Sequence, residues 1–594
     1  MNEQQTTQLP TSISQVFDNP LDFTEIKRRY DVRLHELGAA EARLTQQKAE
    51  RRSTLEAIAD KYIGADEETT HLLEARMKAR VRKDLADSIG VGSEQSRYVQ
   101  KVMARLDDIL DFRQTKDTPE LRRAAASYFM AVWDEAIVPT LQFSTGPFNV
   151  DIGFQNTAGV ASMDSVAVGK DGKGNPLPGE LHLSGYSLMD LIKHTDFVGS
   201  IGVMLKRKPL TDKERERLGL YLSSNAPIDD IVRQRIDHVM VNLTDNPVKN
   251  AKLLMIALSG VMLYTAAGSE YIDLTPITLK VPSEGLGRES VLEQKLNTFY
   301  AIADQGLSLG ARITTSAAYA VRRVLEKHGQ TPDPMPQEHN PDISWGANFL
   351  RMVFGDNYTK RDDFQEKADA LDTYFQLIRT HGAGNASSFA TRVAGGAHAD
   401  LYTALSSGCN VLSGDRHGFA NYGVTVQVEP IYHRLKESGK PITDDMIKAE
   451  VDKVWKQEGS FKGIGHPVYN RDPDGNLPGD PRAGVMVDMI RSWNISELND
   501  KLDFYKTWAK YAIKTLEDEK GQKNRFPVNV DFYSGFLLQD RIGLPVESNT
   551  AMFEVGRFFG HLANYMEAIQ FGLVRSKTLY LGDKGRSFTQ NGHS

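Results

Sequence analysis

The chain has 594 residues, of which 40% are apolar and 25% are charged, with a single cysteine and a formal net charge of −7. These fractions are typical of a soluble globular protein, and the mild negative charge argues against a nucleic-acid-binding surface, which needs concentrated basic residues. The lone thiol of Cys409 excludes an internal disulfide and a cysteine-based zinc site. At roughly 100–200 residues per domain, the length predicts about three to five domains, or fewer large ones.

Neither the start of the chain nor its most apolar run has the pattern of a membrane-directing segment. The polar start of the chain differs from a signal peptide, so we expect residues 1–20 to be a disordered lead. The most apolar run, Leu253 to Gly268, is shorter than the roughly 20 residues that cross a bilayer, and it predicts a buried helix. We therefore expect a cytoplasmic protein with no membrane partner.

Residues 1–147 are predicted to form a helical extension. Between Asp22 and Asp87, apolar residues fall at spacings compatible with a heptad seam, namely Leu34, Leu37, Leu44, Leu55, Ile58 and Tyr62. Charged residues would occupy the same seam at Glu41, Lys48 and Arg51. A coiled coil and an ordinary helical hairpin therefore both remain open.

The pattern changes near Gly146. FNVDIGFQN and SMDSVAV, from Phe148 and Ser162, alternate as strands do, and residues 170–180 have the composition of a turn. Helical patterning resumes after Gly185-Tyr186 and continues to the end. The sequence predicts a mainly α fold with a small strand-containing segment near 148–183.

Four later stretches combine glycine with histidine or acid in this helical background. They are HGAGNASS at 381–388, GDRHGFAN at 414–421, GIGHPVY at 463–469 with DPRA at 480–483, and NVDFYSG at 529–535. Glycine permits tight turns and close backbone approach, and a histidine on such a turn can present one ring nitrogen to a substrate oxygen. Taken singly, each histidine could be structural, Asp531 could be a helix cap, and Arg557 could be an ion-pair partner.

A metal site is an alternative use of the histidines. His381, His398, Asp400 and His417 are residue types that bind zinc or iron, but their spacing is not that of compact ligand motifs. The sequence also contains no phosphate-binding Gly-x-x-x-x-Gly-Lys-Ser/Thr loop and no Gly-x-Ser-x-Gly elbow. We expect no metal and no cofactor.

The order of the stretches resembles the citrate synthase family. HGAGNASSFAT is similar to its HEGGN segment, LSGDRHGFAN to HG-x-AN, GIGHPVY with DPRAGVM to GxGHxxY…DPRA, and FPVNVDFYSG to PNVDFYSG. FEVGRFFG and VRSKTLYLG resemble the segments that follow, and GELHLSGYSLMDLIKHTDF resembles one upstream. The resemblance covers about Phe148 to Gly582, and residues 1–147 have no counterpart in it.

The resemblance implies a two-domain, all-helical fold. A large domain would span 148–416, a small closing domain 417–531, and residues 532–594 would return to the large domain. Closure would exclude water during the reaction. The family also implies a homodimer or higher homo-oligomer whose sites are completed across the interface.

The family condenses acetyl-CoA with oxaloacetate to form citrate and CoA, the reaction that feeds acetyl groups into the tricarboxylic acid cycle. By resemblance, Asp531 would remove the methyl proton, His417 would bind the thioester oxygen, and His466 would polarise the ketone. The citryl thioester would then be hydrolysed.

The resemblance also implies the binding residues. The oxo acid would meet His381, Arg482, Arg557 and Arg575, the last reaching in from the partner subunit, because a dianion attracts several cations. CoA would lie against the loop of His466 and near the aspartate segment, at Gly463, Ile464, Gly465, Val468 and Asn529.

Three departures from the family pattern leave the substrate open. Gly382 stands where the family has glutamate, Tyr422-Gly423 stands where it has an acid, and Arg482 lies 16 positions after His466, several more than usual. Arg471 is the alternative to Arg482 for the carboxylate. The open alternatives are 2-methylcitrate synthesis from propionyl-CoA, or a non-catalytic, regulatory scaffold.

Overall fold

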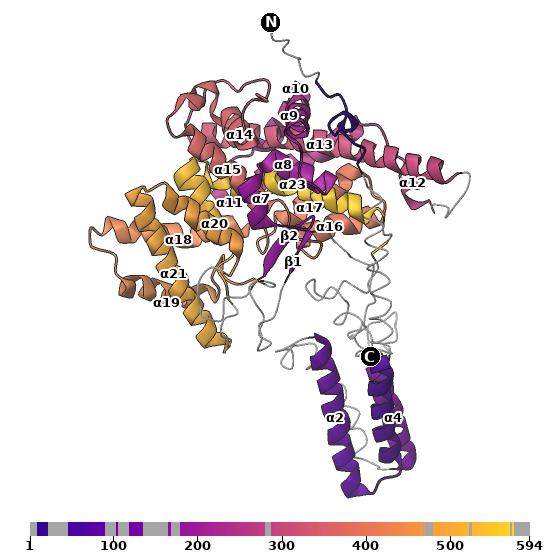
Figure 1. Cartoon of the computed structure of the whole chain (residues 1–594). Helices are drawn as coiled ribbons and strands as arrows, with labels where there is room; N and C mark the ends of the chain where they lie inside the picture. Colours follow the sequence, from indigo (N-terminus) through magenta and orange to yellow (C-terminus); the bar gives the residue numbers. More distant parts are fainter. Residues whose placement is uncertain are drawn as a thin grey trace, which may run out of the picture. The chain divides into compact units, whose positions relative to one another are not determined.

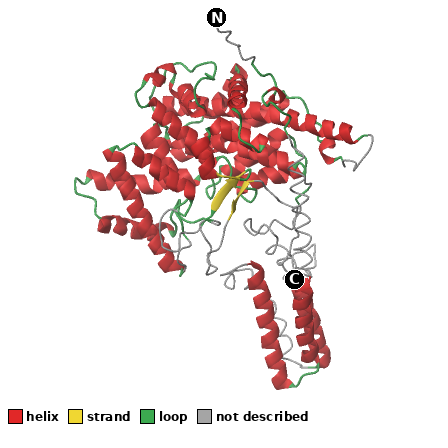
Figure 2. Cartoon of the chain, in the orientation of Figure 1, coloured by secondary structure: helices red, strands yellow, loops and turns green. Residues whose placement is uncertain are grey.

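A computed structural model describes residues 9–21, 46–89, 103–104, 118–134, 164–167, 179–279, 287–466, 469, 479–521, 526–570 and 573–574 (Figure 1). The chain divides into two compact units. The first, the body, contains residues 1–26 and 162–572, and the second contains residues 27–161 and 573–594. Helices dominate the described residues of both units (Figure 2), so the predicted mainly α fold is confirmed.

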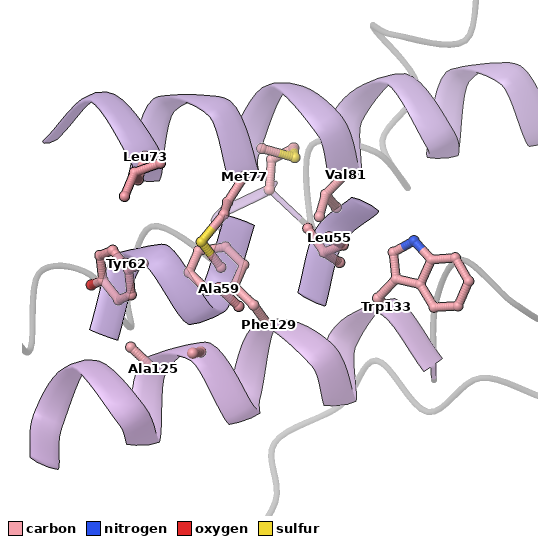
Figure 3. Close-up of a cluster of buried hydrophobic side chains, with 11 residues drawn as sticks. Leu55, Ala59, Tyr62, Leu73, Met77, Val81, Ala125, Phe129 and Trp133 are labelled. Atoms are coloured by element: carbon pink, nitrogen blue, oxygen red, sulfur yellow. The ribbon is translucent and has the colours of Figure 1, made fainter. Parts of the chain in front are cut away.

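The second unit has a hydrophobic core shared by the helix over 46–63, α2 (Glu67–Ile89) and α4 (Pro119–Val132) (Figure 3). Its buried residues are Leu55, Ala59, Tyr62, Leu73, Met77, Val81, Met103, Ala125, Ala126, Phe129 and Trp133. Trp133 also donates its indole N–H to buried Asp84 at 3.2 Å. Leu55 and Tyr62 of the expected seam are therefore core residues of a helical bundle, whereas Leu34, Leu37 and Leu44 lie outside the described residues.

The body begins with a packed segment, so the prediction of a disordered lead is wrong for residues 9–21. Residues 9–21 are not a disordered lead, because Ile13, Val16 and Phe17 are buried. The backbone N–H of Ile13 donates to Asp304 at 2.5 Å, and that of Leu21 donates to Tyr300 at 2.9 Å. Buried apolar side chains and these hydrogen bonds together anchor the segment on the body.

A small antiparallel sheet follows, with strand order β1-β2-β3. It consists of β1 (Asp164–Ala167), β2 (Glu180–Leu183) and β3 (Tyr186–Ser187). Asp164 pairs with Leu183, and Leu183 pairs with Tyr186. The strand predicted within SMDSVAV is confirmed, whereas FNVDIGFQN and most of the predicted turn lie outside the described residues.

The rest of the body is helical. Its first half contains α7 (Leu188–His194), α8 (Phe197–Lys206), α9 (Asp212–Asn225), α10 (Asp230–Met240), α11 (Pro247–Ala267), α12 (Thr275–Thr278), α13 (Arg288–Lys327), α14 (Trp345–Phe354), η4 (Asp356–Lys360) and α15 (Phe364–Ile378). Its second half contains α16 (Ala386–Gly396), α17 (Leu401–Leu412), α18 (Ala420–Glu437), α19 (Asp444–Glu458), α20 (Pro481–Ser492), α21 (Ser496–Lys520), α22 (Val530–Phe536), η5 (Leu537–Ile542), η6 (Val546–Ser548) and α23 (Asn549–Ala568). In Figure 1 the colours place α23 among helices from much earlier in the chain.

The central helix is α23, because all of its residues are buried. It packs against α13, α15, α16 and α17. A helix that is enclosed on every side belongs in the core, and glycines on its neighbours make room for it. A side chain at Gly306 or Gly310 of α13 would collide with Leu562 or Phe559 of α23.

The most apolar run lies in α11. The prediction of a buried helix holds for one face of α11 and not for the other. Its inner face, including Leu254, Leu258 and Met262, is buried, whereas Ile256 and Leu263 are 54% and 48% exposed. By length and composition alone α11 could cross a membrane, and half of its most apolar window is buried inside the protein. The same test is met by core helices of soluble proteins.

Candidate active site

His417 lies on a tight turn between α17 and α18. Its backbone N–H donates to the Gly414 carbonyl at 2.9 Å, and its carbonyl accepts from Ala420 at 2.8 Å. Gly418 is required here because a Cβ would lie 2.8 Å from both the side chain and the carbonyl oxygen of Leu412. Close packing, rather than an unusual backbone angle, therefore explains the glycine beside this histidine.

The ring of His417 is held by Ser387, the second residue of α16. The Ser387 backbone N–H donates to Nε2 at 3.3 Å, and the Ser387 hydroxyl lies 2.9 Å from the same nitrogen. Because a backbone N–H can only donate, Nε2 is the acceptor and the ring proton is on Nδ1. His417 can thus present a Nδ1–H donor.

His466 lies on a loop that pairs with the segment before Asp531. Ile464 and Val528 form an antiparallel bridge, Gly465 N–H donates to the Pro527 carbonyl at 2.7 Å, and Asn529 N–H donates to the Gly463 carbonyl at 3.0 Å. Gly463 and Gly465 have φ of +71° and +99°, which other residues rarely adopt. This pairing brings together two segments more than 60 residues apart in sequence.

The tautomer of His466 is also determined by a backbone donor. Tyr469 N–H donates to Nδ1 at 3.1 Å, so the proton is on Nε2. The ring centroids of His466 and His381 are 4.9 Å apart, in an edge-to-face arrangement. His381 is buried, and its Nε2 bonds to no residue that the structure describes. The next residue, Gly382, has φ of +88°, which explains a glycine where a glutamate would be strained.

Asp531 is at the start of α22, which Asn529 caps by accepting the Asp531 N–H at 3.0 Å. Its Oδ1 is shielded from solvent and has no hydrogen-bond partner among the described residues. Burial raises the pKa of Asp531 to about 7, although the charge of Arg482 acts in the opposite direction. A carboxylate of this kind is poised to take a proton near neutral pH.

Arg482 is held by Asp480, and both side chains are buried. Nε and Nη2 of Arg482 donate to the two Asp480 oxygens at 3.0 and 2.8 Å. The same carboxylate accepts the backbone N–H of Arg482 and of Val530, each at 3.0 Å, so it caps α20 and also binds the first N–H of α22. Burial acts to lower the pKa of Arg482, but the nearby Asp480 carboxylate holds it above its usual value.

Arg557 projects from α23, which glycines bring close to α15. A Cβ at Gly560 would lie 2.0 Å from the Arg379 carbonyl oxygen, and one at Gly556 would collide with Ile378. Arg557 donates from Nε to the Ile378 carbonyl at 2.5 Å and from Nη1 to Asn385 at 3.1 Å. Burial and the nearby charge of Arg482 lower its pKa to about 9.

The three histidines are neutral near pH 7. Burial, together with the charge of Arg557, lowers the pKa of His417 to about 3. Burial lowers the pKa of His466 to about 4, with Arg482 adding to the effect. The pKa of His381 is well below its usual value because of burial and four nearby groups, namely Arg482, His466, Arg557 and His417. Neutral rings can donate hydrogen bonds to substrate oxygens without giving up a full proton.

The structure therefore brings six predicted residues into one site: His381, His417, His466, Asp531, Arg482 and Arg557. Gly463, Ile464, Gly465 and Asn529 of the predicted CoA set lie on the two paired segments beside His466. Arg575, Val468 and the alternative Arg471 lie outside the described residues. In the described part of the chain, no group of three or more His, Cys, Asp or Glu side chains could hold a metal ion.

The sequence did not predict the roles of Asp480, Ser387 and Asn385. These residues hold the side chains of Arg482, His417 and Arg557, respectively. Asp480 had a usable signal, because aspartate directly before proline is favoured at a helix start. Ser387 and Asn385 had none, because their role depends on side chains distant in sequence.

Residues 153–575 match the family model described as the citrate synthase C-terminal domain. The chain belongs to the citrate synthase family. Its relatives include citrate synthases of Helicobacter pylori, 26% identical over 74% of this chain and 92% of the relative, and of Haloferax volcanii, 24% identical over 69% and 92%. Citrate synthase 1 of Mycobacterium tuberculosis is 29% identical over 48% of this chain and 61% of its own length. That match spans less than two thirds of the relative.

Solved citrate synthase structures share the fold. The enzyme of Thermoplasma acidophilum, solved as a ternary complex with carboxymethyl coenzyme A and oxaloacetate, has a TM-score of 0.52 and 20% identity, covering 71% of this chain and 94% of that one. The Pyrobaculum aerophilum enzyme has a TM-score of 0.51 and 20% identity, covering 72% and 97%. At these identities the comparison supports the all-helical citrate synthase fold and no finer detail.

Proposed function

We propose that this citrate synthase family member condenses acetyl-CoA with oxaloacetate to give citrate and CoA. The observation that carries the proposal is Asp531. Its Oδ1 lacks a partner among the described residues and its pKa is about 7, in a site that also holds neutral histidines and two buried arginines. A methyl group beside a thioester is a weak acid, so its deprotonation needs such a base and a donor to the forming enolate.

In the first step, the Asp531 carboxylate takes a proton from the acetyl methyl group. The electron pair of the broken C–H bond moves toward the thioester oxygen. The Nδ1–H of His417 donates to that oxygen, because Nε2 is occupied by Ser387. The low pKa of His417 keeps the ring neutral, so it stabilises the oxygen by donating its Nδ1–H rather than by transferring a full proton.

In the second step, the enolate carbon attacks the ketone carbon of the oxo acid. The Nε2–H of His466 donates to the ketone oxygen, which gains the negative charge and takes this proton. The proton that Asp531 removed returns to the imidazole through solvent, so the step conserves protons. The new C–C bond gives citryl-CoA, and water then cleaves its thioester to release citrate and CoA. Asp531, His417 and His466 carry the proton transfer and the hydrogen bonds of these steps, and water is the third reactant.

Two arginines are suited to the oxo acid carboxylates. Asp480 accepts from Nε and Nη2 of Arg482, so Nη1 is the amino group that we assign to a substrate carboxylate. Ile378 and Asn385 accept from Nε and Nη1 of Arg557, so Nη2 is the amino group that we assign there. Guanidinium groups fixed by other bonds lose little freedom when they bind a carboxylate. Nε2 of His381 is a further contact.

We also propose a homodimer or higher homo-oligomer, in which Arg575 of a second copy completes the site. The proposal rests on the likeness of VRSKTLYLG, which contains Arg575, to the family's terminal arginine-bearing segment. A small domain of residues 417–531 that closes over the substrates belongs to the same proposal.

The test is CoA release from acetyl-CoA and oxaloacetate, followed with a thiol reagent. Asp531→Asn should lower kcat by about 10²–10⁴-fold, the usual contribution of a general base. Asp488→Asn, an exposed acid on α20, is the matched control and should not change it. Undiminished turnover by Asp531→Asn would refute the mechanism. Propionyl-CoA as the faster substrate would favour 2-methylcitrate synthesis, and no turnover of either thioester would favour a scaffold.

A further inference from the structure

Lys252 of α11 contacts the turn that carries His417 at three places. Its Nζ donates to the Ser413 carbonyl at 2.6 Å and to Asp415 Oδ1 at 2.7 Å. The same ammonium lies 3.8 Å from the centroid of the Phe419 ring. Ser413, Asp415 and Phe419 are on both sides of His417 in the sequence, so one cation holds both arms of the turn.

Each contact has a physical reason. Ser413 is the C-cap residue of α17, and the last carbonyls of a helix lack partners within the helix, so a cation there is favourable. An aromatic ring attracts a cation over its face. Phe419 is also held by the neighbouring residue of α11, since Ala251, Phe419 and Tyr422 form a small buried cluster. The turn is therefore seated on α11 by a polar contact and an apolar one.

We propose that Lys252 is a positioning residue for the reaction, which holds the His417 turn on α11 so that the His417 Nδ1–H reaches the thioester oxygen. This inference rests on the proposed function, because it assumes that His417 binds that oxygen. Within the turn itself, Gly418 packs against Leu412 and allows little adjustment. A shift of the turn would therefore move the histidine as a unit rather than be absorbed locally.

The position of Lys252 makes the proposal testable without unfolding the protein. Its side chain is 35% exposed and that of Asp415 is 75% exposed, and exposed ion pairs contribute little to folding stability. Lys252→Met keeps the aliphatic stem and removes the charge, and Lys252→Arg restores the charge. Lys249→Met removes an exposed lysine three residues earlier on the same helix and is the matched control.

The assay compares kcat, the KM for oxaloacetate and the kinetic isotope effect with acetyl-CoA deuterated in its methyl group. Lys252→Met should lower kcat by about tenfold to a hundredfold, the scale of a misplaced catalytic group, with little change in the KM for oxaloacetate. The isotope effect should rise, because enolisation becomes more rate-limiting. Lys252→Arg should recover most of kcat, and Lys249→Met should match the unmodified enzyme.

A purely structural role for Lys252 would lower the unfolding midpoint without raising the isotope effect, and that result would overturn the proposal. So would a Lys252→Met enzyme with the kcat of the control, or a Lys252→Arg enzyme as slow as Lys252→Met. His417→Ala separates a failure of the proposed function from a failure of the positioning role of Lys252. If it retains full activity, the proposed function fails. If it is inactive while Lys252→Met is normal, only the positioning role fails.

Discussion

Replacing Asp480 with asparagine tests how the site holds Arg482. In the native protein one carboxylate accepts four hydrogen bonds, from the Arg482 backbone, Nε and Nη2 and from Val530, at 2.8–3.0 Å. Asparagine has almost the same shape but only one acceptor oxygen. If the amide oxygen takes the place of Asp480 Oδ1, it keeps the hydrogen bonds from the Arg482 backbone and Nε. The amide NH₂ then takes the place of Oδ2 and faces two donors, Arg482 Nη2 and the Val530 N–H.

The expected loss of stability follows from burial. Asp480 is 0% exposed and Arg482 is 2% exposed, so the substitution leaves an unpaired charge in the interior. Removing one partner of a buried ion pair costs about 3–5 kcal/mol. The guanidinium should also turn away from its present direction, and a tenfold weaker contact with an oxo acid corresponds to about 1.4 kcal/mol.

Two measurements check this prediction. The free energy of unfolding in urea should fall by about 3–5 kcal/mol for Asp480→Asn, and the KM for oxaloacetate should rise at least about tenfold. Asp488→Asn, exposed on the same helix, should change neither quantity. If stability fell by less than about 1 kcal/mol, the pair would not be the anchor inferred from its burial. If stability fell but the KM did not change, Arg482 would not contact the oxo acid.

Three further predictions follow from the geometry. The kcat/KM for acetyl-CoA should rise with pH and reach half its maximum at about pH 7, because burial raises the pKa of the base Asp531, which must lose its proton to act. His417 and His466 stay neutral over the same range because their pKa values are far lower. A profile that is flat from pH 5 to 9, as a carboxyl of ordinary pKa would give, would be incompatible with this role. Gly560→Ala should lower the free energy of unfolding in urea by about 1–3 kcal/mol, because the new Cβ would lie 2.0 Å from a carbonyl oxygen. Gly219→Ala in α9 is the control and should not destabilise the protein, because its Cβ would have no heavy atom within 4 Å. Ile13→Ala should lower the free energy of unfolding by about 2–5 kcal/mol in the same assay, because the Ile13 side chain is fully buried. An unchanged free energy of unfolding would contradict the packing of residues 9–21 on the body.

Much of the fold and part of the site could be predicted from the sequence. Apolar periodicity predicts the helices of the body, since each needs one face to bury. Glycines beside His417, His466 and His381 predict tight turns, and the structure has a left-handed or closely packed glycine at each: Gly418, Gly465 and Gly382. Asp531 and Asp480 each precede or start a helix, as their side chains favour.

What the sequence by itself determined is the residue types of the site and the local turns that present them, because turn and cap preferences act over a few neighbouring residues. Only the tertiary structure decided which turns meet. The pairing of Gly463–Gly465 with Pro527–Asn529, the contact of Arg557 with Ile378 and the Lys252 contacts with the His417 turn all join segments far apart in the chain. Such contacts depend on close packing between whole helices, and that packing is not encoded in any short pattern.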